Sequence, residues 1–331
     1  MSVSFPYKIQ ARDEMIRRIN QFAGEGSPFL MIVDFKAEKG FVLEEKEWDE
    51  EFLQFSVAQK SFGKIDEASV EFSWQIHPVS KEEYAPKFNY VVEQIGLGNS
   101  FLTNLTQSTT VKTDLTIDRL YQLGHARYKL WLKDHFTVLS PEIFVRIDGN
   151  AISSYPMKGT IDASLPDAER IILDDYKEKA EHATIVDLIR NDLSQVADEV
   201  EVKRYRYVER LTTHQKDLLQ VSSEISGKLP DGFRSQLGDI LFSMLPAGSI
   251  CGAPKPKTLE IIEHAEGYER DFYTGIFGWF DGRNFDSAVM IRFAEPASDG
   301  LTFKSGGGIT SQSDLEKEYE ELIHKVYVPL I

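Results

Sequence analysis

Two pairs of glutamates have the residue type and spacing of a metal site. Glu178 and Glu181 are three residues apart, and Glu318 and Glu321 repeat that spacing near the end of the chain. Because residues three apart share a helix face, each pair presents two carboxylates in one direction. If the two helices face each other, the carboxylates form an oxygen site suited to Mg²⁺. Taken singly, either pair is more often a solvated acidic face.

Three further features could bind or attack an anionic substrate. Lys158 stands in Tyr155–Thr160, where the simplest interpretation is a solvated turn lysine. Gly306–Gly308 separates a predicted strand from a predicted helix, so its backbone N–H groups can approach an anion, although a flexible turn is the alternative. Arg292 stands in the apolar run Val289–Phe293, as a sheet-edge charge or as a fixed fork for a carboxylate. A long buried strand favours the fork.

Composition excludes several classes of function. The 331 residues include 42% apolar and 27% charged residues, and the net charge is −16. Such an acidic chain lacks the basic surface that a nucleic acid requires. No apolar run approaches the roughly 20 residues of a membrane span, and Met1 to Tyr7 does not have the pattern of a signal peptide. The single cysteine, Cys251, indicates a reducing compartment. We therefore expect a cytoplasmic protein that contacts neither nucleic acid nor membrane.

The order of the predicted elements favours an α+β fold. Strands arrive in hairpin-like runs with helices between them, as at 275–280 and 285–294, which are joined by the hairpin signal Asp281–Asn284. This pattern favours antiparallel sheets covered by helices over a doubly wound fold. Alternating residues also predict a strand at 70–76. Periodicity predicts helices at 8–24, 81–95, 115–133, 167–197, 234–244, 255–266 and 313–327.

Seven segments together carry a stronger signal than any one of these features: Ser140–Glu142, Pro156–Thr160, Glu181–Asp192, Pro246–Lys255, Met290–Arg292, Gly306–Ile309 and Glu318–Glu321. In this order they resemble the motifs of the chorismate-utilising enzymes, and within that family those of the aminodeoxychorismate synthase large subunits. The resemblance implies one chorismate-binding domain over 1–331, with 1–85 a shortened amino-terminal part and 86–331 the catalytic part. It also implies the fold: two large antiparallel β-sheets packed as a sandwich, with helices outside.

The resemblance further implies the roles of individual residues. Glu181 and Glu321 would hold Mg²⁺, with Glu178 and Glu318 acting near it or through water, and the cation would bridge to the ring carboxylate of chorismate. Glu142 matches the general acid that protonates the departing C4 hydroxyl. The remaining matched positions would contact the substrate: Thr160, Cys251, Tyr273, Arg292, Gly307, Gly308 and Lys325.

Lys158 distinguishes the subfamilies. In the aminodeoxychorismate enzymes that it resembles, a lysine here attacks C2 of chorismate, and ammonia then adds at C4 as the lysine leaves. Anthranilate synthases have alanine here, and isochorismate synthases use a lysine at the position of Leu102. The resemblance thus implies 4-amino-4-deoxychorismate synthesis for 4-aminobenzoate and folate. Because the chain has no glutaminase motif, a separate glutamine amidotransferase subunit would supply the ammonia.

Some positions depart from the family pattern and keep two alternatives open. Cys251 replaces the usual threonine or serine, Ile161 and Ala163 replace an Arg-x-Arg, and Gln220 stands near a common histidine. The alternatives are an anthranilate synthase component I and a catalytically silent chorismate-binding subunit. His214 has no partner of functional spacing and is interpreted as structural.

Overall fold

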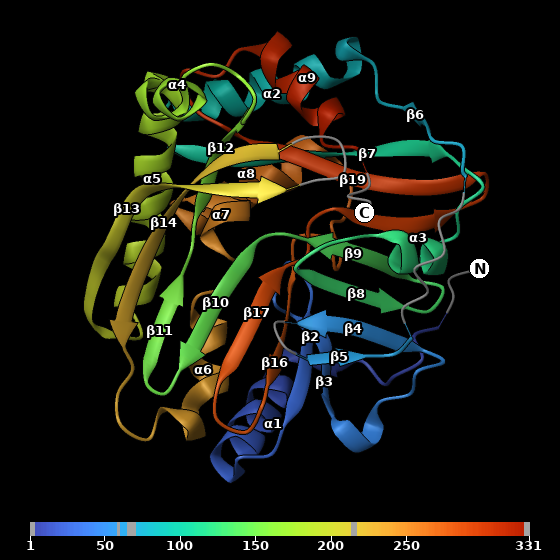
Figure 1. Cartoon of the computed structure of the whole chain (residues 1–331), viewed down its shortest axis with the longest axis vertical. Helices are drawn as coiled ribbons and strands as arrows, with labels where there is room; N and C mark the ends of the chain where they lie inside the picture. Colours follow the sequence, from blue (N-terminus) through green and yellow to red (C-terminus); the bar gives the residue numbers. More distant parts are fainter. Residues whose placement is uncertain (1–3, 58–59, 65–70, 213–216, 328–331) are drawn as a thin grey trace.

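The computed structural model describes residues 4–57, 60–64, 71–212 and 217–327 (Figure 1). His214 and the start of the strand predicted at 70–76 lie outside these ranges. Within them the chain forms two antiparallel sheets covered by helices, so the α+β sandwich predicted from the sequence is confirmed.

Among the described residues, ten strands form the first sheet, and every pairing is antiparallel. Their spatial order is β1 (Gln10–Ala11), β3 (Lys39–Glu44), β2 (Phe29–Val33), β16 (Ile276–Phe280), β17 (Phe285–Val289), β10 (Ile143–Asp148), β11 (Ala151–Ser154), β14 (Asp217–Lys228) and β12 (Met157–Asp162), with β13 (Asp198–Thr212) also paired to β14.

In the part of the chain that the structure describes, nine strands form the second sheet, again with antiparallel pairs only. Their order is β15 (Gly252–Ala253), β7 (Leu102–Lys112), β19 (Gly300–Ile309), β18 (Phe293–Ala297), β9 (Phe136–Ser140), β8 (Tyr128–Leu132), β4 (Leu53–Val57) and β5 (Lys60–Phe62), with β6 (Gln75–His77) paired to β7.

The two sheets pack face to face through alternating side chains. In β2, Leu30 and Ile32 belong to a buried cluster that includes Phe55 of β4 and Leu130 of β8. The residue between them, Met31, belongs to a second cluster on the opposite face. Because successive side chains of a strand point to opposite faces, β2 contributes to the sandwich core and to the helix-covered core at once.

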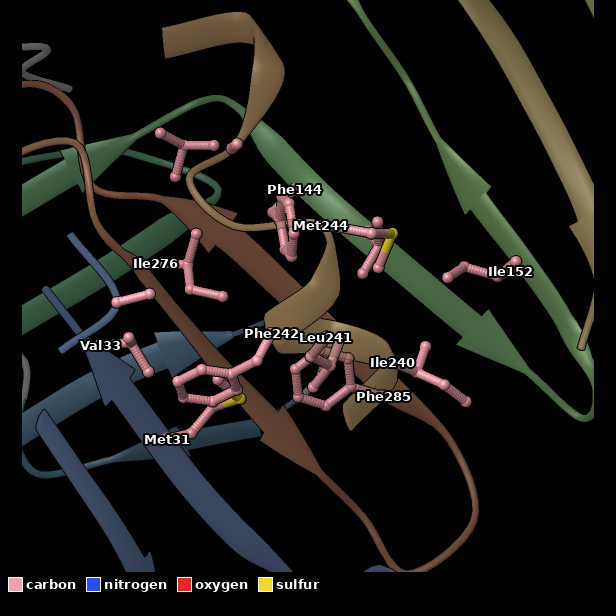
Figure 2. Packing of buried hydrophobic residues seen from close by; sticks show 14 of the residues in the cluster. Met31, Val33, Phe144, Ile152, Ile240, Leu241, Phe242, Met244, Ile276 and Phe285 are labelled. Atoms are coloured by element: carbon pink, nitrogen blue, oxygen red, sulfur yellow. The ribbon is translucent and has the colours of Figure 1, made fainter. Parts of the chain in front are cut away.

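Helices cover the outer faces of both sheets. The first sheet is covered by α1 (Arg12–Glu25), α5 (Tyr176–Ser194) and α6 (Leu237–Ser243), and the second by α2 (Lys81–Gly96), α3 (Ile117–Leu123), α8 (Lys255–Glu266) and α9 (Leu315–His324). Figure 2 shows Leu241 and Phe242 of α6 among Met31 and Phe285 of the first sheet. No helix within the described ranges is long and apolar enough to cross a membrane.

Four predicted elements differ from the structure, and three of them are two helices and a strand. The helix at 115–133 is wrong beyond α3, because Tyr128–Leu132 is a fully buried strand paired on both sides. Pairing with two neighbours overrides the helical pattern there. The strand at 70–76 is also wrong over 71–74, since β6 begins only at Gln75. The helix at 167–197 is broken at Asp175 into α4 (Ala168–Asp174) and α5, and the Asp175 carboxylate caps α5 by accepting from the amide of Glu178 at 2.9 Å.

The predicted strand 285–294 is two strands in different sheets. β17 ends at Val289 in the first sheet, and β18 starts at Phe293 in the second. Arg292 is therefore in the crossing between the sheets and not inside a long buried strand, and its φ of 51° lies in the left-handed region. From this crossing the charge of Arg292 acts on Glu142 and on Lys325.

Candidate active site

Two acidic helices, α5 and α9, approach β12 of the first sheet and β19 of the second. A Cβ atom at Gly159 of β12 would lie 3.1 Å from Oε2 of Glu178. At Gly307 of β19 it would lie 3.4 Å from Oε2 of Glu318 and 3.6 Å from Oε1 of Glu321. At Gly159, which has a φ of 85°, a side chain would crowd the carboxylate, whereas at Gly307 a Cβ atom would be in ordinary van der Waals contact with the carboxylates.

Lys158 joins these carboxylates. Its ammonium nitrogen lies 2.7 Å from Oε2 of Glu181, whose side chain is only 6% exposed. Burial alone would lower the pKa of Lys158, but the negative charges of Glu181, Glu321 and Glu178 outweigh it and raise that pKa. Burial, with the charges of Glu181 and Glu321, raises the pKa of Glu178 against the opposing effect of Lys158. The lysine and the three carboxylates thus form one electrostatic cluster.

Lys325 is the second cation of the cluster. It lies one turn after Glu321, forms a 2.6 Å ion pair with Oε1 of that residue and donates to the carbonyl oxygen of Gly306 at 2.8 Å. Burial lowers the pKa of Lys325, Glu321 raises it, and Lys158 and Arg292 lower it further. The glycine tract and the last helix are therefore tied together at this lysine.

Glu142 lies in the turn between β9 and β10 and faces the same charges. Its Oε1 accepts a 2.5 Å hydrogen bond from the hydroxyl of Ser249. Burial raises the pKa of Glu142, while the hydrogen bond and the charges of Lys325, Arg292 and Lys158 oppose the rise. A carboxyl group whose pKa is raised is suited to donate a proton near neutral pH.

Arg292 and Tyr273 complete the group. The guanidinium of Arg292 lies 5.0 Å from the ring centre of Tyr327, with Nη2 3.5 Å from its hydroxyl. Tyr273 is 3% exposed, and burial raises its pKa; the charges of Arg270 and Glu266 act on it most strongly, and those of Arg292 and Glu142 less. Sequence reasoning assigned no role to Tyr327 or Ser249, because their contacts join segments far apart in the chain.

Two of the residues predicted to contact the substrate are Thr160 and Cys251. In the described part of the chain, we find no contact that joins either of them to this cluster. Thr160 is exposed on β12, opposite Gln220 of β14. Cys251 is fully buried in the apolar cluster beneath the first sheet, where burial raises the pKa of its thiol to about 11. A Cβ atom at Gly308, the residue after Gly307, would lie 3.0 Å from Cδ1 of Leu102, so Leu102 of β7 packs against the glycine tract.

The carboxylates suit a hard cation. In the part of the chain that the structure describes, no three His, Cys, Asp or Glu side chains already converge as a metal site. However, Oε2 of Glu178 is buried with no hydrogen-bond partner, and an orphaned buried carboxylate oxygen is costly unless a cation or donor meets it. With Glu181, Glu318 and Glu321 beside it, the donors are all oxygens, as Mg²⁺ prefers.

The antiparallel sandwich with a lysine and acidic helices at one end matches a known class. Residues 16–330 match the chorismate binding enzyme family, and the chain belongs to that family. The menaquinone-specific isochorismate synthase MenF of Escherichia coli has the same fold, with a TM-score of 0.73 at 16% identity over 98% of this chain and 83% of that one.

Relatives of several activities are similar in sequence. An uncharacterised PabA-like protein of Haemophilus influenzae is 44% identical over 95% of this chain and 96% of its own length. An anthranilate synthase component 1 of Haloarcula marismortui is 34% identical over 79% of this chain and 54% of its own length. The aminodeoxychorismate synthase component 1 of Escherichia coli is 31% identical over 81% and 61% respectively. Overall identity therefore leaves the reaction open between these activities.

Proposed function

We propose that the chain is the aminating component of an aminodeoxychorismate synthase, a single chorismate-binding domain that makes 4-amino-4-deoxychorismate from chorismate and ammonia. The observation that carries the proposal is the ammonium of Lys158, 2.7 Å from Glu181 within the carboxylate cluster. An amine there can reach a substrate held over the cluster, whereas the alanine of an anthranilate synthase cannot add to it.

The cationic groups and the acidic groups would have different roles in binding a dianionic substrate. Arg292, Lys325 and the backbone amides at Gly307 and Gly308 would hold carboxylate oxygens of chorismate. Glu181 and Glu321 would hold Mg²⁺, with Glu178 and Glu318 beside them. When bound, the cation supplies positive charge for the ring carboxylate, which the acidic helices alone would repel.

The chemical steps then belong to Lys158 and Glu142. The neutral amine of Lys158 forms a bond to C2 of chorismate, both ring double bonds shift by one position, and the C4–oxygen bond breaks so that the hydroxyl leaves as water with the proton of Glu142. Ammonia next adds at C4, both double bonds shift back, and the C2–nitrogen bond to Lys158 breaks. Lys158 must lose a proton before it attacks, and Oε2 of Glu181 is the acceptor within reach at 2.7 Å.

Ammonia would come from a separate glutamine amidotransferase subunit, for 4-aminobenzoate and folate synthesis. The rival reaction is that of anthranilate synthase component I, which the 34% identity to such a protein favours. A silent chorismate-binding subunit is the other alternative, since Cys251 and Ala163 depart from the family pattern.

Product analysis separates the three. The protein is incubated with chorismate, Mg²⁺ and ammonium, and the products are identified by mass spectrometry. We expect 4-amino-4-deoxychorismate. Anthranilate would favour the rival reaction, and Mg²⁺-dependent chorismate binding without turnover would favour the silent subunit.

A further inference from the structure

We propose that Ser249 is a positioning residue for Glu142, held in place by a buried ion pair between Asp192 and Lys255. The inference rests on the proposed function, because it assumes that Glu142 protonates the leaving hydroxyl. It adds a group that acts through the general acid and does not touch the substrate.

The hydrogen bond makes the two oxygens of Glu142 unequal. The hydroxyl of Ser249 donates to Oε1 at 2.5 Å in the interior of the protein. A carboxyl group whose one oxygen already accepts a hydrogen bond carries its proton on the other oxygen, here Oε2. The same bond restricts rotation of the carboxyl group. Ser249 therefore fixes both the orientation of the acid and the atom from which the proton departs.

Ser249 contacts Glu142 on the side that faces a small cavity. Glu142, Asp192 and Ser249 line a small cavity of about 20 Å³, together with Phe144 and Met244, which lie side by side in Figure 2. That volume is room for about one water molecule and is far too small for chorismate. Lys158, Glu181 and Arg292 are not among the residues that line it. The cavity thus marks the rear of Glu142, away from the groups that would hold the substrate.

A buried ion pair holds the short helix that carries Ser249, α7 (Gly248–Cys251). Asp192 of α5 accepts from the backbone amide of Gly248 and pairs with Lys255 at 2.8 Å. Lys255 also donates to the carbonyl oxygen of Met244 at 2.8 Å, and the two paired side chains are 18% and 11% exposed. Breaking such a pair leaves a charge buried without a partner, so α7 is held firmly against α5.

The test compares Ser249→Thr, which keeps the hydroxyl, with Ser249→Val, which has nearly the same shape without it. Turnover of chorismate with ammonium is measured across pH for both, with Ser249→Ala as a third variant. For Ser249→Val and Ser249→Ala we expect kcat to fall roughly 10- to 100-fold with KM changed less than about threefold, since an oriented general acid contributes about 10²- to 10⁴-fold. Ser249→Thr should retain most of the wild-type kcat.

The pH profile supplies a readout that a purely structural role would not change. The hydrogen bond from Ser249 favours the ionised carboxylate, so its loss raises the pKa of Glu142 further. Because the protonated acid is the active form, the alkaline limb of kcat should move to higher pH in Ser249→Val and stay in place in Ser249→Thr.

The variant Glu142→Gln distinguishes the positioning role of Ser249 from the role of Glu142 as general acid. If Glu142→Gln is inactive while Ser249→Val matches wild type in kcat and pH profile, the positioning role is wrong and the proposed function stands. If Glu142→Gln keeps wild-type activity, Glu142 is not the acid, and the positioning role of Ser249 fails with it, while product analysis still decides the proposed function. Equal losses in Ser249→Thr and Ser249→Val, with no shift of the alkaline limb, would also overturn the positioning role.

Discussion

The ammonium nitrogen of Lys158 and Oε2 of Glu181 are 2.7 Å apart, so the proposed nucleophile and a proposed metal ligand share one carboxylate. The pair joins β12 to α5. It also means that the charge needed to bind a cation is the charge that keeps Lys158 protonated. Variants designed to test metal binding and variants designed to test Lys158 therefore both change the environment of the Glu181 carboxylate.

Glu181→Gln and Glu321→Gln should each lower kcat/KM more than roughly 100-fold, because each removes a charged oxygen from a site for a hard cation. Glu178→Gln should lose less and regain part of its activity in excess Mg²⁺. Mg²⁺ affinity is measured by calorimetry in parallel with activity. Glu320→Gln, an exposed change on α9, is the matched control. Wild-type activity of Glu321→Gln at ordinary Mg²⁺ concentrations would remove this residue from the metal site.

Arg292→Lys should raise KM for chorismate about 10- to 100-fold with a smaller effect on kcat. A lysine keeps the charge but cannot reproduce the planar fork that grips a carboxylate with two hydrogen bonds. Steady-state kinetics at saturating ammonium measure the change, and Arg283→Lys on the exposed hairpin β16–β17 is the control. Unchanged chorismate affinity in Arg292→Lys would make this arginine structural.

The burial of Lys129 makes the stability of the folded protein depend on pH. It is 5% exposed on β8 beside the ring of Tyr121, and burial lowers the pKa of its ammonium to about 8. Between pH 8 and pH 10.5 the unfolded chain holds the proton and the folded chain does not, so this group makes stability rise with pH in that window. Below pH 8 both states are protonated, and the full cost of burying the charge remains.

Lys129→Met should therefore stabilise the protein at pH 7 by about 1–3 kcal/mol, the upper value being the pKa shift converted at 1.36 kcal/mol per unit. The gain should shrink towards pH 10. Urea denaturation at both pH values measures it, with the exposed Lys8→Met as control. A destabilised Lys129→Met at pH 7 would show that the contact with Tyr121 outweighs the cost of burial.

Local patterns predict antiparallel sheets covered by helices and single out the candidate groups of the site, whereas the sandwich and the roles of those groups follow from the resemblance to the chorismate-utilising enzymes. Paired glutamates on two helices, a glycine tract and a lysine between short strands can be recognised without knowing how they meet. The structure then places Glu178, Glu181, Glu321 and Lys158 in one electrostatic cluster. Local periodicity was enough to predict the helices that carry the glutamates, since each helix has its own repeat of buried and exposed residues, but not that the two helices meet.

Other features depend on contacts between distant segments and could not be predicted. Val289 to Phe293 has the composition of a strand, but the chain crosses between the two sheets there. Arg292 therefore lies between two strands and not within one. Ser249 meets Glu142 across 107 residues of sequence, with no periodic signal. Cys251, expected to contact the substrate, belongs to the apolar core instead, since the short helix α7 buries its thiol completely.

Lys158→Ala is the most direct test of the proposed reaction, with external ammonium as nitrogen source and products identified by mass spectrometry. Addition of the lysine at C2 expels the C4 hydroxyl, and alanine has no group that can add. We expect 4-amino-4-deoxychorismate formation to be lost. In the wild type given chorismate without ammonia, we expect a lysine adduct in the peptide spanning Ile152 to Arg170. Formation of 4-amino-4-deoxychorismate by Lys158→Ala at a near-normal rate would contradict the covalent role of Lys158.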